Sequence, residues 1–395
     1  KLDVSANQDF FLWHTWFKDI FDNGGFDIII GNPPYISIRT KNFPKEQKEI
    51  YKKQYSLAVG QYDVYTLFIE RAYHLLKQNG ILSYIIPTRM LSNENFMPAR
   101  KFVMNNIPIL LYVNAEAPFE TASVEANIMV CKRTKERNSV ICQHFSNKDK
   151  QFHNLSVISY EFVHRMPFSI FPFVYEEKVL HLLKKIQDTP NKLLGTYLTI
   201  TRGFECGYND PCIGHGTSPF IKSESIKSYF PIIDNPLFCS PDYTKSTVYK
   251  TKDVFADTPK LITKFCSNTI QFSLDEVGYC NTNSVYNCSI LNGVTNVNAL
   301  LAILNSKVTT FWFNTAFMNI DGLFPHIQKN QLESIPIPII ANEQLKSLSN
   351  IVDEIITERR NNPSRDTSFL EYQIDQLVYT LYNLTPEEIA IIEGA

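Results

Sequence analysis

The sequence of 395 residues lacks several features that would place a protein in a class at once. It has no run of the roughly 18 apolar residues that a membrane-spanning helix needs, and its first residues do not form a signal peptide. Its eight cysteines include no Cys-x-x-Cys pair, so we interpret them as reduced thiols and expect no zinc site. These absences favour a cytoplasmic protein with neither a membrane segment nor a bound metal.

An excess of one charge is also missing. The chain has 38 basic and 40 acidic residues, which gives a formal net charge of −2. The total therefore indicates neither a nucleic acid nor a membrane as partner, and DNA binding would need a local basic surface. With 44% hydrophobic residues and no internal repeat, the chain has a globular composition and is long enough for two or three domains.

The first third of the chain alternates strand and helix patterns. Apolar runs predict strands at residues 26–31, 81–87, 109–114 and 126–132. Residues 64–78 carry apolar side chains at helical spacing and end at Asn79-Gly80, a common stop signal. Strand–helix–strand units of this kind predict an α/β fold with a parallel, doubly wound sheet.

The pattern changes after about residue 145. A helix is predicted at 174–187, and the segment from 193 to about 290 has the texture of short strands. Further helices are predicted at 297–306, 342–360 and 367–382, with a last one beginning at Thr385-Pro386 in a capping box. We therefore predict a first domain over 1–145, a connection over 146–192 and a second domain over 193–395.

The tetrapeptide Asn32-Pro33-Pro34-Tyr35 directly follows the first predicted strand. Ligands of α/β sheets bind beyond the carboxyl ends of strands, and the two prolines make this loop stiff. The Asn32 amide oxygen, the Pro33 carbonyl oxygen and the Tyr35 ring together suit a planar amino group. Two accepted hydrogen bonds would localise the nitrogen lone pair, so that it can attack a methyl sulfonium without prior deprotonation. The alternative is a proline-stiffened turn with a tyrosine packed on the surface.

The surroundings of this loop resemble a known family. The segment "GFDIIIGNPPYI" resembles motif IV of the amino-group methyltransferases, and residues 11–21 resemble the aromatic lead-in of type IIG restriction–modification enzymes. Residues 61–91 and 116–133 resemble motifs V, VI and VIII of adenine-N6 DNA methyltransferases. Six segments after Leu193 resemble, in order, the TaqI-like C-terminal specificity domain. The chain thus looks like the C-terminal part of a type IIG-like restriction–modification enzyme.

The resemblance implies a fold and a set of site residues. The fold would be a partial Rossmann-like, S-adenosylmethionine-dependent methyltransferase sheet, followed by an α+β DNA target-recognition domain with C-terminal helices. Asn32 and Pro33 would accept hydrogen bonds from the target N6 amino group, within the catalytic set that includes Pro34 and Tyr35. Tyr35 and Phe119 would stack on a flipped-out adenine, and Phe68 with Asn32 would contact the cofactor. The alternatives are an ordinary core aromatic for Phe119, and a helix core residue packed on Ala72 for Phe68.

Part of the family pattern is missing from this sequence. No glycine-rich cofactor loop and no following acidic residue stand in residues 1–23. We therefore expect the N-terminal remainder of the same polypeptide to supply them, and expect the Asn32 strand to present an exposed hydrophobic edge. The chain alone should bind S-adenosylmethionine weakly and be inactive. A restriction endonuclease fused to it would lie upstream, since no PD-(D/E)xK-like cluster is found.

The expected partner is double-stranded DNA. Contacts to phosphates position a protein on DNA, and contacts to base edges determine which sequence it recognises. The basic run 132–137 offers Lys132 and Arg133 for phosphates, or forms a solvated face. The loop "TRGFECGYND" and its surroundings offer further DNA-binding residues, each of which could equally hold a turn: Arg202, Tyr208, Asn209 and Asn283. His326 is a further candidate for DNA binding; the alternative is a histidine with a purely structural role.

Three other functions compete with DNA methylation. Glutamine-N5 protein methyltransferases share the Asn-Pro-Pro-Tyr motif, because an amide nitrogen poses the same chemical problem. They lack a large downstream domain, and RNA adenine-N6 methylation is disfavoured for the same reason. A non-catalytic DNA-recognition fragment is the third alternative, against which the intact residues 32–35 argue.

Overall fold

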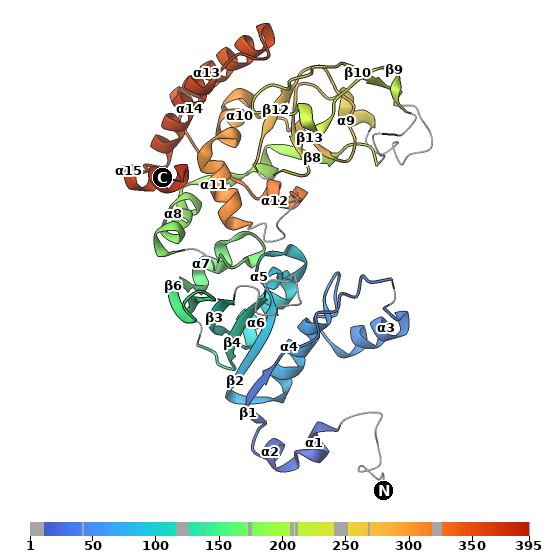
Figure 1. Cartoon of the computed structure of the whole chain (residues 1–395), viewed down its shortest axis with the longest axis vertical. Helices are drawn as coiled ribbons and strands as arrows, with labels where there is room; N and C mark the ends of the chain where they lie inside the picture. Colours follow the sequence, from blue (N-terminus) through green and yellow to red (C-terminus); the bar gives the residue numbers. More distant parts are fainter. Residues whose placement is uncertain are drawn as a thin grey trace. The chain divides into compact units, whose positions relative to one another are not determined.

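The computed structural model describes residues 12–41, 43–115, 126–136, 138–172, 176–205, 209, 212–240, 252–267, 269–317 and 326–394. The chain divides into two compact units, Lys1–Leu180 and His181–Ala395 (Figure 1). The division falls inside the segment 146–192 that was expected to connect two domains. Part of that segment is a strand of the first unit, so the first unit extends beyond residue 145.

The first unit is built on a mixed sheet of six strands in the order β1-β2-β4-β3-β5-β6. The strands are β1 (Phe26–Gly31), β2 (Leu76–Pro87), β3 (Ile109–Ala115), β4 (Ala126–Lys132), β5 (Ser139–Ser146) and β6 (Gln151–Ser159). The pairs β1–β2 and β3–β5 are parallel, whereas β2–β4, β3–β4 and β5–β6 are antiparallel. The α/β fold is confirmed, but the sheet is mixed and not parallel throughout, because short connections such as that between β5 and β6 pair strands antiparallel.

The helices of the first unit mostly lie between its strands along the chain. They are α1 (Trp13–Trp16), α2 (Lys18–Asp22), α3 (Lys45–Gln54), α4 (Val64–Leu75), α5 (Arg89–Ser92), η1 (Glu94–Phe96), α6 (Met97–Asn106), α7 (Tyr160–Arg165) and η2 (Pro167–Ser169). The α4 helix ends at Leu75 and β2 begins at once, so the predicted stop signal at Asn79-Gly80 lies inside the strand. Asn79 there adopts a φ of 65°, and the register of β2 against β1 shifts at this point.

The β5–β6 hairpin is an element that the sequence did not predict. Residues 144–154, "HFSNKDKQFHN", were interpreted as a polar segment in which the strand and helix patterns loosen. The first four residues of β6 are all exposed, so the strand has no alternation of apolar and polar positions there. Without a buried face, the pattern that identifies a strand is missing.

The second unit contains one four-stranded antiparallel sheet and two smaller strand pairs. The sheet has the order β12-β11-β13-β8, and the pairs are β10–β9 and β14–β7. The strands are β7 (Asn191–Leu193), β8 (Leu198–Arg202), β9 (Ile213–Phe220), β10 (Leu237–Cys239), β11 (Lys260–Lys264), β12 (Phe272–Asp275), β13 (Val285–Ile290) and β14 (Pro336–Pro338).

Helices form the rest of the second unit. They are α8 (Glu177–Asp188), which spans the division, η3 (Leu194–Thr196), η4 (Ser223–Ser225), α9 (Lys252–Ala256), α10 (Val297–Asn305), α11 (Lys307–Ala316), α12 (Lys329–Glu333), α13 (Asn342–Asn361), α14 (Ser368–Leu381) and α15 (Pro386–Glu393). The predictions of the three C-terminal helices and of the capping box at Thr385 are confirmed. None of the described helices is both long and apolar enough to span a membrane.

Candidate active site

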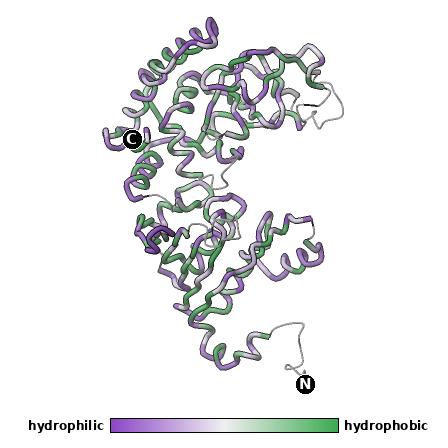
Figure 2. Tube along the Cα trace, in the orientation of Figure 1, coloured by the Kyte–Doolittle hydropathy of each residue, from purple (hydrophilic) through white to green (hydrophobic). Residues whose placement is uncertain are grey.

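The β1 strand forms one edge of the six-stranded sheet, with no partner on its outer side among the described residues. Two of its isoleucines are open to solvent: Ile28 is 58% exposed and Ile30 is 77% exposed. Figure 2 shows this strand as a hydrophobic segment. The expected exposed hydrophobic edge beside the Asn32 strand is therefore present.

Aromatic rings cover the beginning of this edge strand. The ring of Phe26 lies 5.9 Å from Trp13, 5.2 Å from Phe17 and 5.6 Å from Phe21, in each case edge to face. These three rings come from α1, α2 and the residue between them, within the lead-in segment 11–21. The lead-in thus anchors the strand that carries the Asn-Pro-Pro-Tyr loop.

The Asn-Pro-Pro-Tyr loop leaves β1 at Gly31. Asn32 and Pro34 are exposed, Pro33 is buried and Tyr35 is half-buried. The loop ends where the Val64 amide donates a hydrogen bond of 2.8 Å to the Ile36 carbonyl oxygen. Since Val64 begins α4, both ends of the loop are fixed, one by the sheet and the other by a helix.

A cavity of about 420 Å³ lies beside β1 and reaches the first half of this loop. The described residues that line it are Trp13, Phe26, Ile28, Ile29, Ile30, Gly31, Asn32, Pro33, Phe68, Arg71, Ala72, Leu75 and Tyr84. The cavity thus brings together three predicted site residues: Asn32, Pro33 and Phe68. Phe68 is 44% exposed, so it lines the cavity and is not a core residue of α4.

The walls of the cavity are mainly apolar, with few polar groups among them. Ile28, Ile30 and Phe68 offer flat or branched apolar surface, while the Asn32 amide and the Arg71 guanidinium are polar. None of the described lining residues is a carboxylate. The cavity therefore fits a planar apolar group such as a purine ring, and it lacks an acidic acceptor for sugar hydroxyls.

Tyr35 is not among the residues that line this cavity. Its ring lies edge-on to Tyr65, with 6.3 Å between the ring centroids. Its hydroxyl is buried and has no hydrogen-bond partner among the described residues, and burial raises the pKa of Tyr35. Tyr35 therefore presents a neutral aromatic ring next to the polar pair of the loop.

Two buried acids hold the long excursion between Ile36 and α4 in place. The Glu70 carboxylate accepts hydrogen bonds from the backbone amides of Ser56 and Leu57, at 2.8 and 2.9 Å. Asp63 forms an ion pair of 2.5 Å with Arg89. Both acids stabilise the segment that follows the catalytic loop, and the sequence analysis missed them.

The cavity also contains residues that the sequence analysis missed. Arg71 lies one helical turn after Phe68 on α4, and Tyr84 pairs with Gly31 across β1 and β2. The spacing of three residues from Phe68 was the signal that could have identified Arg71. Tyr84 could only be found from the strand register.

Lys132 and Arg133 lie at the far end of the sheet from Asn32. Lys132 ends β4 and Arg133 follows it; β4 runs antiparallel to β2, while β2 is parallel to β1. The Arg133 guanidinium lies 4.6 Å from the centre of the Tyr73 ring and donates a hydrogen bond to the Leu76 carbonyl oxygen. The structure thus separates these two residues from the catalytic loop. Phe119, the predicted second stacking residue, lies outside the described residues.

In the second unit the structure brings two predicted DNA-binding residues together. The Nε and Nη2 atoms of Arg202 both donate to the Asn283 carbonyl oxygen, at 2.8 and 2.5 Å. Asn209 is an exposed turn residue, and Tyr208 lies outside the described residues. His326 is exposed, and its ring stacks on Phe265 with 4.8 Å between centroids.

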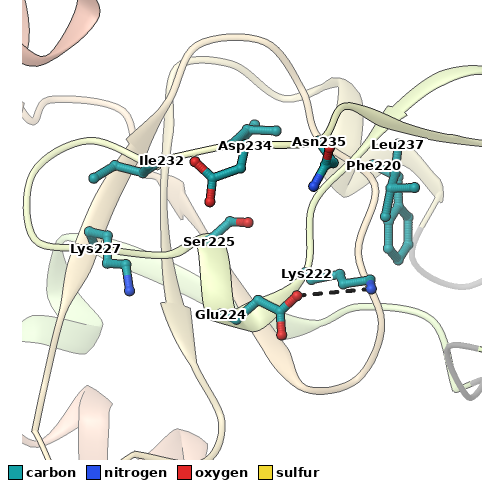
Figure 3. Close-up of a pocket in the computed structure, with 10 residues that line it drawn as sticks. Phe220, Lys222, Glu224, Ser225, Lys227, Ile232, Asp234, Asn235 and Leu237 are labelled. Carbon is teal, nitrogen blue, oxygen red and sulfur yellow. Dashed lines mark ion pairs between the residues drawn. The ribbon is translucent and has the colours of Figure 1, made fainter. Parts of the chain in front are cut away.

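A second cavity, of about 330 Å³, belongs to the second unit (Figure 3). Two lysines and two acids line it, among other residues: Lys222, Lys227, Glu224 and Asp234. Lys222 and Glu224 lie 3.9 Å apart, which makes them an ion pair. Because the acids offset the lysines, this cavity has no net charge that would attract a phosphate. Within the described parts of the chain, no cluster of three or more His, Cys, Asp or Glu could hold a metal ion.

Two family models match this chain. Residues 1–119 match the Eco57I restriction-modification methylase, and residues 222–337 match the TaqI-like C-terminal specificity domain. The type II restriction enzyme and methyltransferase RM.Eco57I of Escherichia coli is 44% identical over 86 residues, which are 21% of this chain and 8% of that protein. The type II methyltransferase M.BstVI of Geobacillus stearothermophilus is 24% identical over 98% of this chain and 78% of its own length.

Other relatives are longer than this chain. A relative from Methanocaldococcus jannaschii is 27% identical over 96% of this chain, which spans 33% of that protein. The type IIL restriction-modification enzyme MmeI, solved in complex with DNA, has a similar fold with a TM-score of 0.59. That likeness covers 93% of this chain and 56% of the other, at 12% identity. The chain thus spans a third or less of the first two curated relatives and about half of this structure.

Proposed function

We propose that this chain acts in site-specific DNA methylation, as a restriction–modification methyltransferase with a TaqI-like C-terminal specificity domain. The matches of residues 1–119 and 222–337 to these two family models support the proposal. The first unit carries the catalytic loop, and the second unit chooses the DNA sequence. The methylated atom is N6 of an adenine that is flipped out of the duplex. A restriction endonuclease is the expected companion activity of the same system.

The observation that carries this proposal is the cavity at the end of β1. Asn32 and Pro33 reach it from the loop, and Phe68 reaches it from α4. A polar pair beside an apolar, partly open cavity is suited to place an amino group next to a bound cofactor. The proposal would fail if the Asn32 side chain were buried against the interior with no cavity beside it. Asn32 is exposed, and the cavity that it and the buried Pro33 line has a volume of about 420 Å³.

The chemistry of the site rests on hydrogen-bond acceptors. The lone pair of an adenine amino nitrogen is delocalised into the ring, which makes it a poor nucleophile. The Asn32 side-chain oxygen and the Pro33 carbonyl oxygen accept hydrogen bonds from the two N–H groups of this amino group. These hydrogen bonds favour a pyramidal nitrogen. The lone pair is then localised on that nitrogen, and the proton is released after methyl transfer. No general base is required before the reaction, which agrees with the absence of a carboxylate or histidine among the described lining residues.

The cofactor of this reaction is S-adenosylmethionine, which supplies an electrophilic methyl group when it is bound. Phe68 and Asn32 line the same cavity, so Phe68 would hold the cofactor by stacking on its purine and the Asn32 amide would contact it from the loop. None of the described residues that line the cavity is an acid that could bind the ribose. We therefore expect residues 12–394 by themselves to bind the cofactor weakly.

The target adenine needs an aromatic partner outside the duplex. Flipping a base out of the duplex costs a few kcal/mol of free energy, and stacking on an aromatic side chain stabilises the flipped base by roughly 1–3 kcal/mol. The half-buried ring of Tyr35 supplies one such surface, and we assign the second to Phe119. Both assignments follow from the order of residues in the family.

The proposal is tested by methyl transfer with the protein produced from its complete coding sequence. Tritiated methyl groups should appear in duplex DNA as N6-methyladenine. The Asn32→Ala variant should lose transfer by at least 100-fold while its DNA affinity stays within a few-fold of the wild type. Asn32 is exposed, so the substitution leaves the core intact. Equal transfer by the variant would contradict the catalytic assignment.

The same assay separates the competing functions. If the tritium label appeared in RNA and not in DNA, the result would favour RNA adenine-N6 methylation. If it appeared in protein glutamine and not in DNA, the result would favour glutamine-N5 methylation. Sequence-specific DNA binding without any transfer would favour a non-catalytic recognition module. The large second unit with its specificity-domain match supports DNA over protein as the substrate.

A further inference from the structure

The Arg202 guanidinium at the end of β8 is held in one orientation. Its Nε and Nη2 atoms both donate to the Asn283 carbonyl oxygen, at 2.8 and 2.5 Å. Asn283 is itself fixed, because its amide donates to the Phe204 carbonyl oxygen at 2.7 Å. One side edge of the guanidinium is thus attached to a rigid turn.

An aromatic ring supports the plane of the same group. The Arg202 guanidinium carbon lies 3.9 Å from the centre of the Phe265 ring, the closest contact of this kind among the described residues. Phe265 is held in turn by His326, whose ring stacks on it at 4.8 Å and 25°. A guanidinium that stacks on a ring and is tied to a carbonyl loses the freedom of its long side chain.

The position follows from the sheet. The strands β8 and β11 lie on either side of β13 and both run antiparallel to it, so their carboxyl ends meet at the same sheet edge. Arg202 ends β8, and Phe265 directly follows β11. His326 joins this edge through a backbone bridge to Cys266. Four segments far apart in sequence therefore form one surface cluster, which consists of Arg202, Phe265, Asn283 and His326.

Arg202 has no carboxylate partner among the described residues, a property it shares with Arg133 of the first unit, which lies over Tyr73 and donates to the Leu76 carbonyl oxygen. Three other arginines with aromatic or backbone contacts each pair with an acid: Arg89 with Asp63, Arg359 with Glu371, and Arg360 with Glu276. Arg202 is half-buried, and its Nη1 donors have no hydrogen-bond partner in the described parts of the chain. A fixed, unpaired cation of this kind is suited to an external acceptor pair.

We propose that the Arg202 cluster reads one guanine of the recognised DNA sequence in the major groove. The inference rests on the proposed function. Two guanidinium donors remain side by side, one on Nη1 and one on Nη2, and guanine O6 and N7 form a matching pair of acceptors. No other base presents two acceptors on this edge, so the pairing selects guanine. Arg202 is the base-reading residue, and Phe265 and His326 are positioning residues.

The test is a selection from randomised duplex DNA with the protein produced from its complete coding sequence. We expect the wild type to select a site that contains guanine. The Arg202→Ala variant should lose the preference for guanine at one position by roughly 5- to 150-fold, the range of a bidentate base contact, with the other positions unchanged. Phe265→Leu should weaken the preference at the same position, because it removes the aromatic support and keeps the apolar volume.

Arg360→Ala is the matched control. Arg360 also lies over an aromatic ring, that of Phe230 at 5.7 Å, but its charge is paired with Glu276. This variant loses the same positive charge from the same unit and should select the wild-type site unchanged.

The outcomes separate the inference from the proposed function. A selected site without guanine overturns the inference, and so does a wild type that selects no sequence. An Arg202→Ala variant that binds all sequences more weakly by an equal factor also overturns it, because that pattern belongs to a phosphate contact. A lower melting temperature with unchanged base preference would assign Arg202 to holding the turn. Selection without methyl transfer would contradict the proposed function and leave the base-reading result standing.

Discussion

At the scale of single residues, Tyr35 carries two properties that conflict in the free protein. Its ring is the stacking surface that we propose for the target base, whereas its hydroxyl is buried with no hydrogen-bond partner among the described residues. A buried hydroxyl without a partner costs roughly 1–3 kcal/mol. The ring and the hydroxyl can be tested separately, because phenylalanine keeps the first and removes the second.

We expect Tyr35→Phe to keep methyl transfer within a few-fold of the wild type, with a melting temperature that does not fall. Tyr35→Ala should weaken binding of a flipped-adenine substrate by about 5- to 150-fold, the equivalent of 1–3 kcal/mol of lost stacking. Methyl-transfer kinetics and thermal denaturation of both variants measure these effects. If Tyr35→Phe were as defective as Tyr35→Ala, the hydroxyl and not the ring would contact the substrate.

Asp375 is a second residue whose environment has a measurable consequence. It is 7% exposed on α14, and burial raises its pKa from 3.8 to about 6, although the Lys307 amide donates to it at 2.9 Å. Glu371 and Glu393 raise this pKa further. The folded protein therefore binds the Asp375 proton more tightly than the unfolded chain does.

It follows that Asp375 stabilises the fold below about pH 4, and that this contribution is lost as the pH rises to about 6. We expect Asp375→Asn to gain stability relative to the wild type over this interval, by up to about 3 kcal/mol at pH 7. Urea denaturation of both proteins at several pH values measures the difference. A difference that does not change between pH 4 and 7 would contradict the raised pKa.

At the scale of elements, α3 stands out because it contributes no buried residue to the first unit. It belongs to the excursion that follows the catalytic loop, and Figure 2 shows it as largely hydrophilic. Lys45, Lys48 and Lys52 are spaced three and four residues apart, so they share one face of the helix. The first and last of them are separated by seven residues, or about 10 Å along the helix axis.

If this face contacts DNA phosphates near the catalytic loop, its lysines contribute to the salt dependence of binding. Replacing Lys45, Lys48 and Lys52 together by glutamine should reduce the slope of log affinity against log salt by up to about three. Fluorescence anisotropy at several salt concentrations measures the slope. A control triple variant replaces exposed lysines of α8 and α13 instead: Lys178, Lys184 and Lys346. Equal slopes for all three proteins would leave α3 without a role in DNA binding.

The elements also show how far the sequence determines the fold. The α13, α14 and α15 helices were predicted to within about one residue at each end, because a periodic apolar face and caps define them locally. The β5–β6 hairpin was missed because the second half of β5 and the first half of β6 bury no residue and so have no such pattern. The start of β2 was misplaced because Asn79-Gly80 forms an irregularity inside the strand, and only pairing with β1 reveals that.

The site residues, like the elements, were predicted where local sequence motifs identify them and missed where only long-range contacts do. Asn32, Pro33 and Phe68 were predicted from short motifs, and the structure brings all three to one cavity. Arg202 was predicted from its loop, but its support could not be, since Phe265 lies 63 residues away and reaches it only through the sheet. Contacts of that kind depend on strand order, which sequence patterns do not contain.

At the scale of the whole molecule, the two units divide the work of the proposed enzyme. The first unit holds the cavity and the catalytic loop, and the second unit holds the Arg202 cluster. Each site lies where strands end, although the two sheets have different topologies. Base reading can therefore change in one unit without any change in the chemistry of the other.

The open edge of β1 has a consequence for how this chain behaves in solution. Ile28 and Ile30 are exposed on a strand that has no partner on its outer side among the described residues. Unpaired backbone groups combined with apolar side chains make such an edge a template for pairing with another chain. We expect the chain of residues 1–395 to associate with itself as its concentration rises.

Ile30→Lys should reduce this association, because a charged side chain at an exposed edge position opposes pairing and costs no buried contact. Sedimentation velocity over a range of concentrations measures it, with Ile339→Lys as the control. Ile339 is 60% exposed in the second unit and is not part of a sheet edge, so its variant should associate like the wild type. If both variants reduced association equally, general charge would explain the effect. If the wild type remained monomeric at all concentrations, the β1 edge would have to be protected by residues outside the described ranges.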